Sequence, residues 1–134
     1  MRILEMALNR ARAAGASYAD ARSLQQADEG LTVRNSQVEQ ARSGMSYGLG
    51  VRVLVDGQWG FAAGSAVSEA EASRLAALAV EIARASSAAR KREVRLAPTP
   101  PAVDTWESTC RIDPWSVPTA RKVDLLREAC KAAQ

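Results

Sequence analysis

The sequence contains no histidine. Neither a catalytic triad that uses histidine as its base nor a zinc site with histidine ligands can therefore be built from this chain alone. Aromatic residues are scarce, and no apolar run approaches the ~20 residues that a membrane-spanning helix needs. The N-terminus alternates charged and apolar residues at helical spacing, unlike a signal peptide. We therefore expect a cytoplasmic protein.

Cysteine is also rare. Cys110 and Cys130 lie outside any C-x-x-C arrangement. Without a secretory context we expect free, partly buried thiols rather than a disulfide. The 134 residues suffice for one domain with a real core but not for two comfortable ones, and the net charge of +3 is small.

The N-terminal third predicts a helix, a strand and a hairpin. Apolar residues recur at helical spacing over 2–14, and Gly15 can close that helix in the left-handed conformation. A strand is expected at 18–26. Residues 30–42 form a candidate hairpin around Asn35–Ser36, in which Val33 pairs with Val38. One face of this hairpin is expected to be buried and the other exposed to solvent. Ser43–Gly44 is expected to reverse the chain again.

A stronger hairpin signal is Asp56–Gly57, since both residues tolerate positive φ. A two-residue loop pairs Leu54 with Trp59 and Arg52 with Phe61 on one face. The other face combines β-branched residues with very small ones, which leaves room for a close helix; these are Val51, Val53, Gly60 and Ala62.

Gly48-x-Gly50 hints at a phosphate-binding loop. A dinucleotide fingerprint, however, needs its glycines after a strand and at the start of a helix. Here they precede a strand and lack the third glycine. We expect them to mark a bulge or a place where another backbone comes close.

The next helix is predicted at 68–85. Ser68 and Glu71 have the spacing of a capping box, in which each side chain bonds the other residue's amide. The apolar stripe, expected to rest on the small-residue face of the hairpin, comprises Leu75, Leu78, Ala79, Ile82 and Ala83.

Residues 86–115 read as an extended, proline- and arginine-bearing connection, with a short strand at 94–96. A last helix is expected over 116–134, with Pro118 in its first turn. It reaches Gln134 without a stop signal, as in a chain that has been cut. The fold class is α+β: a domain over 1–85 with an antiparallel meander of about four or five strands flanked by helices, then the connection, then the start of a C-terminal helix.

Three segments together resemble the amino-terminal domain of the TldD/PmbA family: VRNSQVE, GVRVLVDGQWGFA and IDPWSVP. These proteins are zinc metallopeptidases, also described as modulators of DNA gyrase. The last segment is closer to the TldD branch, and Ser36 replaces the glycine usual after the turn asparagine. The TldD branch carries a His-Glu-x-x-x-His motif downstream of this region. The resemblance implies a longer, dimeric parent that cleaves small or unfolded peptides with zinc.

No catalytic or metal-binding residue of that family can be transferred here, because the chain has no histidine. The carboxylate pairs Asp28–Glu29 and Glu69/Glu71 are better explained by a turn and a helix cap than by acid–base catalysis. The candidate peptide- or partner-binding residues are Arg52, Trp59 and Phe61; the alternative is an internal arginine–aromatic stack.

Three functions remain open. The first is a non-catalytic domain of a TldD-type metallopeptidase that supplies scaffold, dimer surface and part of a peptide groove, with a homodimeric or heterodimeric partner. The second is a free-standing peptide- or protein-binding module that uses a sheet edge. The third and least favoured is a DNA- or gyrase-associated regulator, since the basic cluster Arg90–Arg92 with Arg95 lies in a linker without interleaved aromatics.

Overall fold

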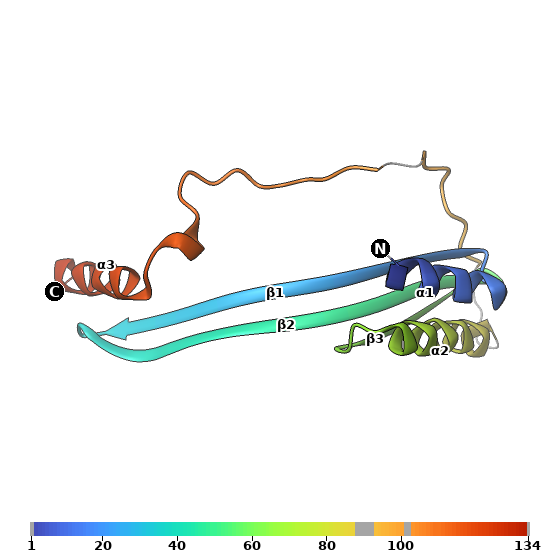
Figure 1. Ribbon diagram of the computed structural model, residues 1–134, viewed down its shortest axis with the longest axis horizontal. Coiled ribbons are helices and arrows are strands. Elements are labelled where there is room, and N and C mark those ends of the chain that lie inside the picture. Colours follow the sequence, from blue (N-terminus) through green and yellow to red (C-terminus); the bar gives the residue numbers. More distant parts are fainter. Residues whose placement is uncertain (1, 88–92, 101–102, 134) are drawn as a thin grey trace. The chain divides into compact units, whose positions relative to one another are not determined.

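The computed structural model describes residues 2–87, 93–100 and 103–133. In chain order the elements are α1 (Arg2–Ala13), β1 (Tyr18–Arg34), β2 (Gln37–Val55), β3 (Gln58–Gly64), α2 (Glu69–Ser87), the 3₁₀ helix η1 (Pro114–Ser116) and α3 (Thr119–Ala132) (Figure 1). The strands form one antiparallel sheet in the order β1-β2-β3. The α+β class is confirmed.

The number of strands is not four or five but three within the described residues. The segments expected at 18–26 and 30–42 belong partly to one uninterrupted strand, β1, so Asp28–Glu29 lies in a strand and not in a turn. Ser43–Gly44 likewise lies inside β2. Gly44 has no positive φ; a Cβ there would stand 3.2 Å from Asp28 Oδ1. The glycine therefore makes room for a neighbouring side chain instead of reversing the chain.

Both predicted two-residue turns are confirmed. Asn35 and Ser36 have φ of 49° and 62°, and Asp56 and Gly57 have 48° and 71°. Positive φ at both central positions is the type I′ geometry that matches the twist of antiparallel strands. The register of the second hairpin is also as predicted, with Arg52 opposite Phe61.

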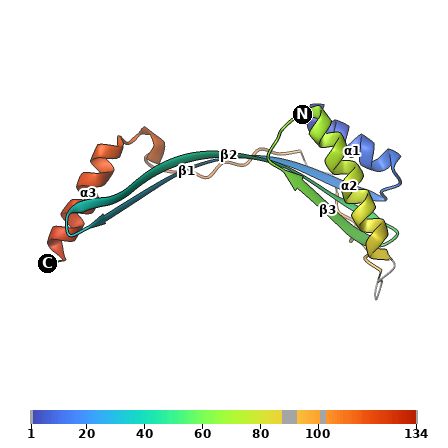
Figure 2. The ribbon, with the colours of Figure 1, turned by 90° about the horizontal axis from the view of Figure 1, so that it is seen from below.

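The contacts divide the chain into two compact units. The first comprises residues 1–26 and 45–98, and the second comprises 27–44 and 99–134. Within the first unit, α1 and α2 lie side by side on one face of the sheet (Figure 2). Their alanines pack on the valines of β2: Ala7, Ala11, Ala76, Ala79 and Ala83 are fully buried.

The contact between α2 and the hairpin is unusually close at Gly60. A Cβ at this position would overlap Ala79 O and stand 2.8 Å from Ala83 N. The predicted docking of α2 on Val51, Val53, Gly60 and Ala62 is therefore confirmed. The predicted stripe is wrong in part, because Leu78 and Ile82 are 37% and 38% exposed. Ala79 and Ala83 of α2 lie against Gly60. Leu78 and Ile82 therefore lie on the flank of the helix.

The start of α2 realises half of the predicted capping box. Ser68 Oγ accepts a hydrogen bond from the Glu71 amide at 3.2 Å. The Glu71 carboxylate instead accepts two hydrogen bonds from Arg74, one from Nε at 2.8 Å and one from Nη2 at 2.7 Å. These bonds lower the pKa of Glu71, foremost through hydrogen bonding to Arg74. The salt bridge thus replaces the expected bond back to the Ser68 amide.

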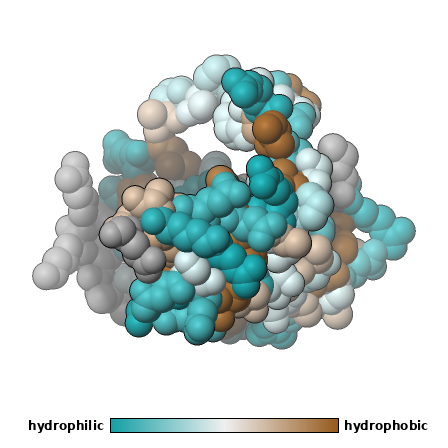
Figure 3. Space-filling view, turned by 90° about the vertical axis from the view of Figure 1, so that its left-hand side faces the viewer, coloured by the Kyte–Doolittle hydropathy of each residue, from teal (hydrophilic) through white to brown (hydrophobic). Residues whose placement is uncertain are grey.

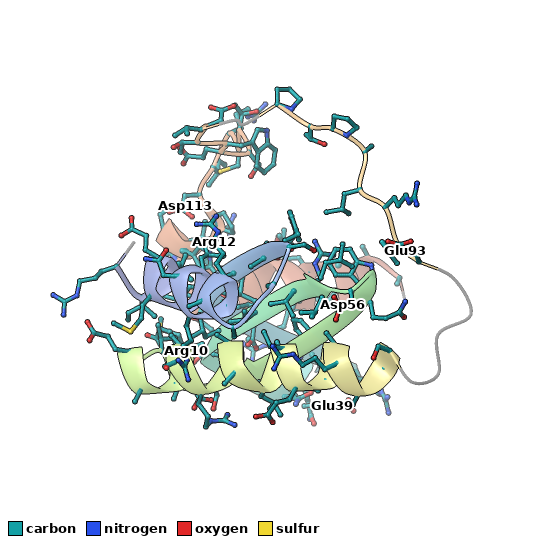
Figure 4. The ribbon with its side chains drawn as sticks, turned by 90° about the vertical axis from the view of Figure 1, so that its right-hand side faces the viewer. Arg10, Arg12, Glu39, Asp56, Glu93 and Asp113 are labelled. Atoms are coloured by element: carbon teal, nitrogen blue, oxygen red, sulfur yellow. The ribbon has the colours of Figure 1, made fainter. Side chains whose placement is uncertain are left out.

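The strand expected at 94–96 is absent: residues 93–100 and 103–110 have neither helix nor strand. A hydrogen bond from the Val94 amide to Gly57 O, at 2.9 Å, connects this segment to the β2–β3 turn. Glu93 thereby lies beside the β2–β3 turn that contains Asp56 (Figure 4). The basic cluster at 90–92 and Gln134 fall outside the described residues. None of the described helices is both long and apolar enough to cross a membrane.

Candidate functional site

The sheet face opposite α1 and α2 carries the predicted arginine–aromatic cluster. Arg52 Cζ lies 4.8 Å from the centre of the Trp59 ring, within range for a cation–π interaction. Tyr18 of β1 meets the same ring edge-on, with centroids 5.9 Å apart. The three strands thus each contribute one side chain, because alternate residues of paired strands share a face.

Arg52 is held in place by a carboxylate that the sequence reasoning missed. Its Nε and Nη2 both lie 2.7 Å from Asp20 Oδ2. The hydrogen bond to Asp20 raises the pKa of Arg52, and the attraction between the two charges adds to this effect. The guanidinium is consequently charged and oriented, with 43% of the side chain still exposed.

Phe61 follows on the same face but is much more open, at 59% exposed. Its ring leans over Gly50, where an added Cβ would stand 3.2 Å from Phe61 Cε2. Gly48 and Gly50 are therefore neither a phosphate loop nor a place where another backbone approaches. They lie inside β2, and at Gly50 the missing side chain admits the phenylalanine ring.

These residues border a shallow groove of about 720 Å³. Its lining includes Gly48, Gly50, Arg52, Phe61 and Leu24. Pockets that combine apolar side chains with a few oriented polar groups are typical of ligand sites, and this groove combines Phe61 and Leu24 with the oriented Arg52 guanidinium. The groove thus combines Arg52 and Phe61, two of the three predicted site residues. Trp59 touches Arg52 beside the groove without belonging to its lining.

The sequence did not predict Tyr18 and Asp20 as site residues, because the alternation of apolar and polar residues along β1 is weak. The signal was nevertheless present: in YADAR the larger side chains alternate with alanine. Ala19 and Ala21 pack toward the helices. Tyr18 and Asp20 must then face the opposite side.

The described residues do not fit the zinc that the family resemblance implies. They contain no group of three or more histidine, cysteine, aspartate or glutamate side chains able to hold a metal ion. Cys110 and Cys130 are free, and only Cys130 is partly buried.

The second unit has its own polar cluster. Glu29 in β1 accepts hydrogen bonds from Lys122 and, at 2.8 Å, from Thr119 Oγ1. Lys122 Nζ also lies 5.8 Å from the centre of the Trp115 ring. Farther along α3, Cys130 Sγ is 3.7 Å from Val33 O. These contacts hold α3 against the β1–β2 hairpin.

The β1–β2 hairpin around Asn35–Ser36 is only partly buried on its predicted apolar face. Val33 is half-buried, whereas Val38 is exposed. In Figure 3, hydrophilic side chains dominate the foreground, with hydrophobic patches between them. No residue of α3 is fully buried, so the attachment of α3 depends in part on the Glu29 cluster.

This dependence predicts a pH response. Hydrogen bonds from Lys122 and Thr119 lower the pKa of Glu29 in the folded state. The ionised pair therefore stabilises the attachment fully above the unfolded-state pKa, and the effect is lost as the pH falls through the lowered folded value. Glu29→Gln should remove the response. Trp115 fluorescence, in a background with Trp59 and Trp106 replaced by phenylalanine, would report it. Asp28→Asn is the matched control and should retain it; a titration unchanged by Glu29→Gln would contradict this assignment.

Comparison with known proteins identifies the fold. Residues 19–83 match the family described as PmbA/TldA metallopeptidase domain 1. The resemblance to the first domain of the PmbA/TldD metallopeptidase family is thereby confirmed over these residues. The matched segment contains all of β1, β2 and β3 except the first residue, Tyr18.

Two archaeal relatives extend the match. Metalloprotease MJ0996 of Methanocaldococcus jannaschii is 28% identical over 114 residues, which cover 85% of this chain and 25% of that protein. A metalloprotease of Methanothermobacter thermautotrophicus is 29% identical over 116 residues, covering 87% and 24%. The chain thus spans about a quarter of the length of the curated relatives that it matches.

The fold is also seen in the crystal structure of TldE from Thermococcus kodakarensis. The TM-score is 0.66 with 13% identity, covering 96% of this chain and 30% of that one. At this level of identity the likeness shows the fold.

Proposed function

We propose that this chain serves as the non-catalytic first domain of a TldD-type zinc metallopeptidase that acts on small or unfolded peptides. The family match over 19–83 supports this function. Because the sequence contains no histidine, we assign the hydrolytic step to other polypeptide. In the His-Glu-x-x-x-His motif of the TldD branch, two imidazoles would bind zinc and the glutamate would act as base on the metal-bound water.

Within such an enzyme, this domain supplies a scaffold and part of the peptide groove. The observation that carries this role is the exposed face around Arg52, Trp59 and Phe61. Its guanidinium is fixed by Asp20 and its Phe61 ring is 59% exposed. A preoriented cation beside exposed apolar surface loses little conformational entropy when a peptide binds.

Trp59→Ala tests this role. We expect a folded chain with a single melting transition, and a loss of about fivefold or more in affinity for fluorescein-labelled casein, an unfolded probe. The reason is that the ring supports the Arg52 guanidinium; a lost cation–π contact alone is worth ~1 kcal/mol or more. Fluorescence polarisation measures the affinity.

Val67→Ala is the matched control, because Val67 is exposed outside the groove. It should bind the probe like the parent chain. A Trp59→Ala chain that fails to fold would instead support the internal arginine–aromatic stack.

The same proposal predicts that the purified 134-residue chain does not cleave the casein probe, with or without added zinc. Release of fluorescent fragments gives the measurement. Turnover by this chain would contradict the non-catalytic role.

The groove also favours the second candidate, a free-standing binding module. The coding sequence beyond residue 134 distinguishes the two functions. A downstream His-Glu-x-x-x-His supports the enzyme, and a stop codon supports the module. In either case we propose a homodimer, or a heterodimer with a related family member.

A further inference from the structure

The groove beside Arg52 contains more positive than negative charge. Its lining includes two guanidinium groups, those of Arg22 and Arg52, but a single carboxylate, that of Asp20. The other lining residues are uncharged. The groove therefore has an excess positive charge, which attracts an anionic group from a ligand.

Asp20 binds Arg52 much more closely than it binds Arg22. Its Oδ2 lies 2.7 Å from both Nε and Nη2 of Arg52, whereas its Oδ1 lies 3.9 Å from Arg22 Nε. The Arg22 side chain is 82% exposed, and no second carboxylate among the described residues forms a salt bridge with it. Arg22 thus retains hydrogen-bond donors for a further carboxylate, and an arginine can bind one through two parallel bonds.

A nearby acidic side chain does not cancel this charge. Gly64 lines the groove, and a Cβ at Gly64 would overlap the Glu71 carboxylate. Both oxygens of Glu71, however, accept hydrogen bonds from Arg74. The charge of Glu71 is compensated by its own partner, so the excess charge at Arg22 remains.

Apolar surface lies within reach of the same ligand. Arg22 is on β1 and Phe61 is on β3, with β2 between them. Their backbones therefore lie about 10 Å apart across the sheet, which is two interstrand spacings. The Phe61 ring leans into this interval over Gly50. An extended chain covers about 10 Å in roughly three residues, so one short segment can contact both side chains.

We propose that the groove selects extended peptide segments in which an acidic side chain lies two or three residues from a large apolar one, with Arg22 as the residue that recognises the acid. This inference rests on the proposed peptide-binding role of the groove and adds the class of peptide. The ligand carboxylate binds the Arg22 guanidinium, while the apolar side chain packs on Phe61. Arg52 is already paired with Asp20, which leaves the selection to Arg22.

Isothermal titration calorimetry with unlabelled peptides of about seven residues tests the selectivity. Both peptide ends are blocked, by an acetyl and an amide group, so that only the chosen side chain carries charge. A peptide with the central sequence Glu-Gly-Phe should bind about fivefold more tightly than one with Gln-Gly-Phe, because it gains a charge-assisted contact. The difference should shrink as sodium chloride is raised from about 50 to about 500 mM, because salt screens exposed charges.

Variants of this chain assign the preference to one residue. Arg22→Gln should abolish it without changing the affinity for the Gln-Gly-Phe peptide, whereas Arg22→Lys, which keeps the charge, should retain part of it. Arg12→Gln is the matched control: it removes the same charge from an exposed arginine of α1 outside the groove lining (Figure 4). A preference that Arg12→Gln also abolishes would overturn the role of Arg22.

The outcomes separate this inference from the function on which it rests. Equal affinity for the two blocked peptides would overturn the selectivity and leave peptide binding intact. Binding of neither peptide would overturn both. A Gln-Gly-Phe peptide with a free C-terminal carboxylate should bind like its amidated form; if it bound as tightly as the Glu-Gly-Phe peptide, the site would recognise chain ends and the proposal would fail. Phe61→Ala should weaken both blocked peptides alike, because both contain phenylalanine.

Discussion

Gly60→Ala is expected to destabilise the first unit severely, by about 1–3 kcal/mol or more. The added methyl group would overlap Ala79 O and approach Ala83 N to 2.8 Å. Both atoms belong to the backbone of α2, which cannot turn aside as a side chain can. The helix must therefore lift off the sheet and open the alanine–valine interface beneath it.

Denaturant unfolding, followed by circular dichroism, measures this loss. Gly48→Ala is the matched control, because its added Cβ would meet only Leu24 Cβ at 4.0 Å, an ordinary contact. It exchanges a strand glycine for alanine without a clash. Equal stability of the two variants would contradict the close approach of α2.

Leu75→Ala is expected to cost about 2–5 kcal/mol, the range for a fully buried leucine that leaves a cavity. Leu75 has no exposed surface and lies in the core of the first unit. Leu78→Ala should cost about 1 kcal/mol or less, although both leucines fit the apolar stripe of the same helix. Thermal unfolding of both variants in dilute solution provides the comparison.

The difference between the two leucines follows from the geometry of the interface. Leu78 is 37% exposed on the flank of α2, where solvent can fill the space left by truncation. If Leu78→Ala instead cost as much as Leu75→Ala, α2 would have to be rotated about its axis relative to the orientation described.

Several elements could be predicted because their causes are local. The turn at Asp56–Gly57 follows from two residues that accept positive φ, and counting outward from it gives the whole β2–β3 register. Gly15 ends the first helix with φ of 95° for the same reason. The N-cap of α2 follows from the Ser68 hydroxyl.

Other features escaped prediction because their causes lie far away in sequence. Ser43–Gly44 has turn composition, yet Gly44 lies beside Asp28 of the neighbouring strand. The apolar stripe of α2 contains more residues than actually pack against the sheet. The close contact at Gly60 decides which of these residues are buried. In the candidate site, Arg52 depends on Asp20, 32 positions earlier.

The sequence by itself determined the two turns, the register of the second hairpin, the starts of α1 and α2 and the absence of histidine, whereas α3 begins at Thr119 and not at the predicted residue 116. These depend on backbone preferences and on residue inventory, which act within a few positions or need no structure. Only the tertiary structure decided that β1 and β2 run uninterrupted, that alanines rather than Leu78 meet the sheet, and that Asp20 orients Arg52. Strand pairing and packing bring together residues from distant positions, and the resulting contacts outweigh local propensity.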